Sequence, residues 1–139
     1  MSSIKEQVVV RVPAQKLYAA LTTQEGYNGW WSKDCQIGRK PGDECALKFN
    51  KGGSIVSMRF RIDELTANER VKWTCSGHDQ ESWIGTTLTW SLLADGPRTS
   101  LELLHDAWKS EAPEMVVGGW RHFLGSLRAY LEEGKGDPW

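Results

Sequence analysis

The middle of the chain is a run of strand-like segments with no helical segment between them, and one long amphipathic helix follows. Apolar and polar residues alternate through 44–50, 54–64, 70–76, 83–93 and 99–106, as expected for strands with one buried face. Turn-forming residues separate these segments, including Lys51-Gly52-Gly53 and Ala94-Asp95-Gly96-Pro97. Consecutive strands without intervening helices favour an antiparallel sheet over parallel β-α-β units.

The last segment is predicted to be a helix that starts near residues 110–113 and runs for about twenty residues. On a helical wheel its apolar side chains form one stripe within about 40° of Val116. The other members of the stripe are Trp120, Phe123, Leu127 and Tyr130. Gly134 is expected to end the helix as a C-cap glycine. Such a stripe must be buried, and the sheet is the surface available to bury it.

The N-terminal part adds one strand and two short helical pieces. Residues 4–12 read as a half-buried strand that stops at Pro13, and AQKLYAALTT then reads as a helix with that proline at its first position. The segment YNGWWS predicts a second short helix or turn, and residues 35–43 predict a loop. The fold class predicted is α+β: a curved antiparallel sheet of about six strands around a long C-terminal helix, with a short helical pair after the first strand.

The length and charge of the chain restrict the kinds of function that it can have. A chain of 139 residues suits one domain spanning 1–139. The 17 basic and 18 acidic residues give a net charge of −1, so we expect no nucleic acid partner. No apolar stretch approaches the length of a membrane-spanning helix, and no secretory signal is evident, so no membrane insertion is expected. Three cysteines without a CxxC pair are typical of a reduced compartment, and a cytoplasmic location is predicted.

The spacing of the reactive residues does not indicate a cofactor site or a metal site. His78, His105 and His122 share no ligand motif, and no nucleophile elbow is present. We therefore expect no cofactor and no metal. His105 is the only catalytic candidate, because it shares a strand face with the apolar Leu101 and Leu103 and should point inward. A hydrogen-bonded structural histidine is the competing interpretation. Arg121 and His122 lie off the apolar stripe and are predicted to be surface residues.

Three segments resemble a known family. They are PAQKLYAALTTQEGYNGWW at 13–31, LELLHDAW at 101–108 and GGWRHFLGSLRAYLEEGKG at 118–136. In order and spacing they resemble the SRPBCC superfamily of START-like, helix-grip domains, and within it the heat-shock protein 90 ATPase activator homologue group. The chain departs from the family at His105-Asp106-Ala107, where members often have His-Ser-Gly or His-Thr-Gly. The resemblance covers nearly the whole chain.

The resemblance implies a START-like domain with a cavity between the sheet and the C-terminal helix. The excess of tryptophan, eight residues in all, suggests an aromatic lining. The expected ligand-binding wall, of which about half should touch a ligand, comprises Trp31, Phe60, Trp73, Leu88, Trp90, Leu103, His105, Trp120, Phe123 and Leu127.

Three functions remain open from the sequence. The first is a binding protein for a small apolar or aromatic ligand, and we expect this rather than an enzyme because no second inward polar group accompanies His105. The second is a cyclase-like or hydrolase-like enzyme acting on such a ligand. The third is a stress-response, co-chaperone-like protein whose partner is a chaperone. Either a monomer or a homodimer is compatible with the sequence.

Overall fold

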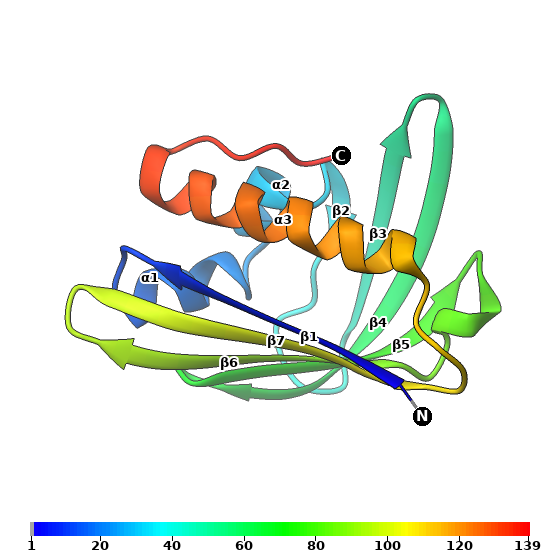
Figure 1. Cartoon of the computed structure of the whole chain (residues 1–139), viewed down its shortest axis with the longest axis horizontal. Helices are drawn as coiled ribbons and strands as arrows, with labels where there is room; N and C mark the ends of the chain where they lie inside the picture. Colours follow the sequence, from blue (N-terminus) through cyan, green and yellow to red (C-terminus); the bar gives the residue numbers. More distant parts are fainter. Residues whose placement is uncertain (1) are drawn as a thin grey trace.

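The computed structural model describes residues 2–139, and a single antiparallel sheet holds all of the strands it describes. Figure 1 shows this sheet curving beneath a long C-terminal helix, which lies across its concave face. The strand order is β1-β7-β6-β5-β4-β3-β2. The strands are β1 Ser2–Val10, β2 Asp34–Gln36, β3 Glu44–Lys51, β4 Ser54–Thr66, β5 Arg70–His78, β6 Thr87–Asp95 and β7 Arg98–Trp108. The helices are α1 Ala14–Ala20, α2 Gln24–Trp30 and α3 Glu114–Glu133, with a 3-10 turn η1 at Glu81–Trp83. The helix-grip α+β prediction is confirmed.

Three local predictions need correction. The segment predicted as a loop, residues 35–43, begins within β2, a strand of three residues that is too short for alternation to reveal. The strand predicted to start at Trp83 starts at Thr87, because Trp83 belongs to η1 and Gly85 takes a positive φ of 91°. Pro13 lies just before α1 as its N-cap, in extended conformation, and is not its first helical residue.

The β3–β4 hairpin forms where the sequence predicted it. Lys51 pairs with Ser54 across a two-residue turn of Gly52 and Gly53, whose φ angles are 61° and 90°. Two positive φ angles define a type I′ turn, which glycine adopts without a steric cost. Figure 1 shows this long hairpin rising beside the first turns of α3.

A bulge in β7 determines which of its side chains point inward. Ser2 pairs with Trp108 and Ile4 with His105, so β7 has one more residue than β1 between these pairs. Ala107 lies in the bulge with a φ of 67°, a left-handed conformation that favours glycine. His105 and Trp108 are three residues apart, yet both are buried. Glycine would adopt this conformation at position 107 without the steric cost that alanine bears.

The helix α3 begins after Pro113 and ends at Gly134, whose φ of 83° is the left-handed conformation expected of a C-cap glycine. Its buried face includes Trp120, Phe123 and Leu127. These residues pack against a core formed by the inner faces of the strands and by α1 and α2. The predicted helix and its apolar stripe are confirmed.

Candidate functional site

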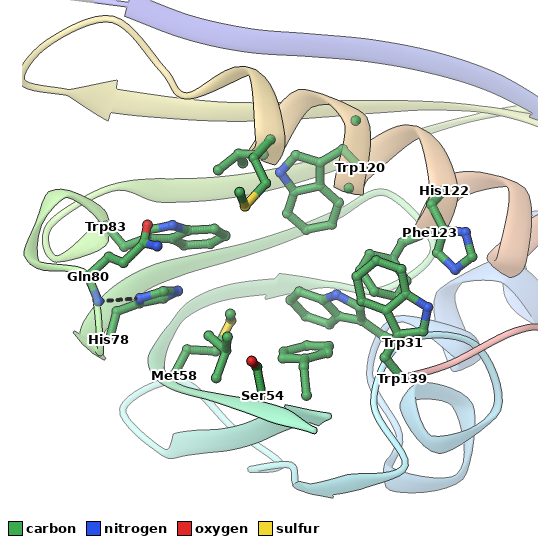
Figure 2. A pocket seen from close by; sticks show the side chains of 16 residues that line it. Trp31, Ser54, Met58, His78, Gln80, Trp83, Trp120, His122, Phe123 and Trp139 are labelled. Carbon is green, nitrogen blue, oxygen red and sulfur yellow. Dashed lines mark hydrogen bonds between the residues drawn. The ribbon is translucent and has the colours of Figure 1, made fainter. Parts of the chain in front are cut away.

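A pocket of about 600 Å³ opens between the first turns of α3, the β3–β4 hairpin and the end of β5 with η1. Figure 2 shows its side chains converging from these elements and from the C-terminal tail. The lining consists of Trp31, Phe49, Ser54, Val56, Met58, His78, Gln80, Trp83, Met115, Val116, Gly118, Gly119, Trp120, His122, Phe123 and Trp139. No Asp, Glu, Lys or Arg is among these described lining residues. The volume lies within the range usual for small-molecule sites.

Aromatic rings form the inner wall, with Trp31 at its centre. The Trp31 ring stacks on Trp30 at 5.5 Å between centroids and 6° between planes, and it lies 5.4 Å from Trp120. Phe123 packs against Phe49 at 5.8 Å and so joins α3 to the hairpin. Because these rings are held by neighbours on several elements, the wall is formed before any ligand arrives.

Two adjacent glycines form the α3 side of the pocket. At Gly118 and Gly119 an added Cβ would meet no described atom within 4 Å apart from the helix's own backbone. Glycine in a helix interior costs about 1 kcal/mol relative to alanine, and close packing of the backbone against the sheet does not explain it here. The missing side chains leave space in the pocket.

His105 lies in a chain of hydrogen bonds that engages both of its ring nitrogens. The indole N–H of Trp120 donates to His105 Nδ1 at 3.0 Å, so the neutral ring carries its proton on Nε2. That nitrogen lies 3.0 Å from the Thr86 hydroxyl, which donates to the Trp83 carbonyl at 2.6 Å. Burial, together with the nearby His78, lowers the pKa of His105 to about 3. Both ring nitrogens have partners within the protein, and the residue is fully buried. The chain of hydrogen bonds joins α3, β7 and the η1 segment.

The structure separates the predicted wall into two groups. Trp31, Trp120 and Phe123 line the pocket. The other seven predicted residues lie in the packed interior and do not line it; they are Phe60, Trp73, Leu88, Trp90, Leu103, His105 and Leu127. Alternation identified the inward face of each strand, but the pocket occupies only one end of that face.

His78 is a pocket residue that the sequence analysis missed. It lies at the end of β5, and its ring stacks on Trp83 at 4.4 Å and 13°. The backbone N–H of Gln80 donates to His78 Nδ1 at 2.8 Å. The other ring nitrogen, Nε2, is buried and has no hydrogen-bond partner among the described residues. Burial lowers the pKa of His78 to about 4, against the opposing influence of Asp79.

The C-terminal tail closes the far side of the pocket. Figure 1 shows it running back along α3 toward α2 and β2. The Trp139 backbone N–H donates to the Trp31 carbonyl at 3.0 Å, and the Lys33 N–H donates to the Trp139 carbonyl at 2.9 Å. The Trp139 ring stacks on His122 at 4.7 Å and 27°. His122, predicted to be a surface residue, therefore lies in the pocket wall, and no periodic pattern in the tail could have predicted the role of Trp139.

The remaining reactive groups offer no second site. Burial is the main reason that the pKa of each cysteine thiol, at Cys35, Cys45 and Cys75, is raised to about 11, so the nucleophilic thiolate is disfavoured. Among residues 2–139, no group of three or more His, Cys, Asp or Glu side chains could hold a metal ion. No helix in the same range is long and apolar enough to cross a membrane.

Comparisons with known proteins place these features in a family. The sequence model for the family described as "Activator of Hsp90 ATPase homolog 1-like protein" matches residues 11–132. The solution structure of the Aha1 dimer from Colwellia psychrerythraea is 30% identical, covers 98% of this chain and 100% of its own, and superposes with a TM-score of 0.80. No curated protein sequence matches the chain.

More distant solved structures share the fold. A crystal structure from Chromobacterium violaceum has a TM-score of 0.82 at 21% identity, covering 94% of this chain and 96% of that one. A START superfamily protein from Mycobacterium smegmatis has a TM-score of 0.75 at 18% identity, covering 96% of this chain and 99% of that one.

The fold and these likenesses define a START-like, helix-grip protein. More narrowly, the chain belongs to the family described as activator of Hsp90 ATPase homolog 1-like proteins, as its sequence motifs had indicated.

Proposed function

We propose that this protein binds a small apolar or aromatic molecule in the pocket beneath the first turns of α3. The observation that carries the proposal is a pocket of about 600 Å³ lined by aromatic and aliphatic side chains, without Asp, Glu, Lys or Arg among the described lining residues. Apolar surface of this kind gains free energy when a ligand displaces water from it. The START-like fold supports the proposal, because helix-grip proteins commonly carry hydrophobic ligands.

Binding accounts for features that packing alone does not. Gly118 and Gly119 weaken the helix and leave space in the pocket. Met115, in the first turn of α3, lines the pocket although the residue is 82% exposed. An exposed methionine at a pocket mouth is a flexible contact that adapts to different ligand shapes.

Native mass spectrometry of the gently purified protein tests this function. A co-purifying small molecule supports it, as does saturable quenching of tryptophan fluorescence by neutral aromatic compounds. Absence of a bound mass, together with absence of quenching by any apolar or aromatic compound in a panel of lipids and ring systems, would contradict it.

Catalysis has weaker support than binding. The catalytic candidate, His105, has both ring nitrogens engaged by Thr86 and Trp120 and does not line the pocket. A cyclase-like or hydrolase-like role would have to use His78 or His122, which lie on different elements, in β5 and α3. Turnover of a bound compound that is lost in His78→Phe or His122→Phe would favour an enzyme.

Interaction with a chaperone is the second candidate, and it rests on family membership. A pull-down with an Hsp90-type chaperone, followed by its ATPase assay with and without this protein, tests that role directly. The Colwellia relative was solved as a dimer, so a homodimer is proposed here too. Light scattering across a range of concentrations will distinguish it from a monomer. A cytoplasmic location and a role in stress response stay predictions.

A further inference from the structure

The backbone N–H of Gln80 determines which ring nitrogen of His78 carries the proton. A backbone N–H can only donate, and that of Gln80 donates to His78 Nδ1 at 2.8 Å. Nδ1 therefore carries no proton, and the neutral imidazole carries it on Nε2. The pKa of about 4, lowered by burial, means that the ring is neutral at physiological pH.

The Nε2–H group of His78 is buried and unpaired among the described residues. Figure 2 shows the ring beneath Trp83, with its second nitrogen directed away from Gln80 into the pocket. A buried donor left without an acceptor destabilises the folded state, and a ligand acceptor would remove that cost. The stack on Trp83, 4.4 Å between centroids, holds the ring in this orientation. The donor is thus positioned at the apolar wall with nothing to receive its hydrogen bond.

Trp120, His122 and Asp79, all at or near the pocket, have polar groups that are already engaged. The Trp120 indole N–H donates to His105. His122 Nε2 lies 3.1 Å from the Asp137 carbonyl oxygen and 3.5 Å from the Asp137 carboxylate. Asp79, the charged residue next to His78, accepts the Ser57 backbone N–H at 2.9 Å and does not line the pocket.

The charge of the lining restricts the ligand further. With no Lys or Arg among its described lining residues, the pocket offers no fixed cation to an anionic ligand. With no Asp or Glu there, it offers no counter-ion to a cationic one. Burying an unpaired charge costs far more than one hydrogen bond returns. Of the buried side-chain nitrogens without a partner, only that of His78 belongs to a described lining residue, and a neutral ligand with one acceptor atom matches both this donor and the apolar wall.

We propose that the ligand is a neutral, planar aromatic compound bearing an acceptor oxygen, such as a ketone or quinone, and that His78 Nε2–H donates a hydrogen bond to that oxygen. This inference rests on the proposed function and assigns its polar anchor. The role of His78 is to orient the ligand.

A pair of probes of matched size and planarity tests the inference. Fluorenone carries a carbonyl oxygen and fluorene does not, and both are titrated by tryptophan fluorescence against the wild type and His78→Phe. Phenylalanine keeps a ring against Trp83 but removes the N–H. The advantage of fluorenone over fluorene is expected to fall about tenfold in His78→Phe, as for one hydrogen bond to a buried donor. Leu93→Phe, at an exposed residue of β6 that does not line the pocket, is the control and keeps the advantage.

Other outcomes separate the inference from the proposed function. If both probes bind and the preference for fluorenone is the same in the wild type and His78→Phe, His78 is not the polar anchor. The proposal that the pocket binds apolar ligands is then retained. If neither probe binds the wild type, both proposals fail. If fluorene-9-carboxylate binds more tightly than fluorenone, the ligand is an anion and the inference is overturned.

Nitrogen-15 NMR of the wild type gives a reading that does not depend on folding of the variant. The expected result is one proton on His78 Nε2 that shifts when fluorenone is added and does not shift with fluorene. A proton on Nδ1 would contradict the inference.

Discussion

Filling the pocket from its own helix should stabilise the protein and weaken ligand binding. Gly119 lies in α3 on the pocket wall, where an added Cβ meets no described atom within 4 Å beyond the helix backbone. Gly119→Leu replaces a poor helix former with a good one, for a gain of about 0.8 kcal/mol in unfolding free energy. For a chain of this length that gain raises the melting temperature by about 3 °C. The leucine side chain occupies ligand space, so the affinity for fluorene is expected to fall tenfold or more, about 1.4 kcal/mol.

Gly125→Leu is the matched control. Gly125 is an exposed residue of the same helix, also with no described atom within 4 Å of its Cβ position apart from the helix backbone, and it does not line the pocket. It should give the same rise in melting temperature with unchanged affinity. Thermal melts and fluorescence titrations of both variants read out the two effects. Equal fluorene affinity in Gly119→Leu and Gly125→Leu would refute the placement of the ligand beside Gly119.

The remaining predictions concern stability. Ala107→Gly should raise the unfolding free energy by about 0.5–1 kcal/mol, because relief of the left-handed alanine exceeds the entropy cost of glycine; a lower melting temperature would contradict this. Because burial depresses the pKa of His78 to about 4 and that of His105 to about 3, the unfolded state binds more protons than the native state below about pH 6.5, and stability falls as the pH drops toward 4. In denaturant titrations near pH 5, the His78→Phe variant should take up about one proton fewer than the wild type when it unfolds. If the slope of the unfolding free energy against pH is the same in both proteins, the ring of His78 is not neutral and buried. Glu132 accepts the Arg11 backbone N–H at 2.8 Å and pairs with the Arg11 guanidinium, and these contacts hold the pKa of Glu132 below its ordinary value. Glu132→Gln should therefore be destabilising at neutral pH, and its difference from the wild type should disappear as the pH falls through the native pKa of Glu132; a difference that persists in acid would indicate a packing effect instead.

Most of the fold was predictable because the long strands and the long helix each show a periodic pattern of apolar residues. Alternation located five of the strands between residues 44 and 106, and the 3.6-residue stripe located α3 with its glycine cap. The strand β2 escaped because three residues cannot show alternation. The start of β6 was misplaced because the chain turns at Gly85, between Trp83 and Thr86, before the strand begins. Trp83 and Thr86 are three residues apart and both buried, whereas in a strand they would face opposite sides.

The site was less predictable, because facing inward and lining the pocket are different properties. Trp90 and Trp120 both point inward and their rings lie 5.6 Å apart, yet only Trp120 reaches the pocket. The two residues lie on different elements: Trp120 is in the N-terminal half of α3, beside the pocket, whereas Trp90 is in the middle of β6. His78 and Trp139 lie beyond the periodic segments, at a strand end and in the tail, so only the three-dimensional structure brings them together.

Trp139 also shows how irregular chain contributes to the site. The tail is held by specific hydrogen bonds, since the Ser126 hydroxyl donates to the Trp30 carbonyl at 2.7 Å and accepts the Asp137 backbone N–H at 2.6 Å. A Cβ at Gly136 would come within 2.6 Å of the Gly29 carbonyl oxygen. That close approach requires glycine and places the last residues along the helix.

Proton–nitrogen NMR of the tryptophan indoles, recorded while fluorenone is added, tests the pocket most directly. Of the eight indoles, Trp31, Trp83, Trp120 and Trp139 line the pocket, whereas Trp30, Trp73, Trp90 and Trp108 are buried and do not line it. The account predicts saturable shifts that are largest for the first group and small for the second. Shifts that are absent, or that are largest at Trp73, Trp90 and Trp108, would contradict a ligand site beneath the first turns of α3.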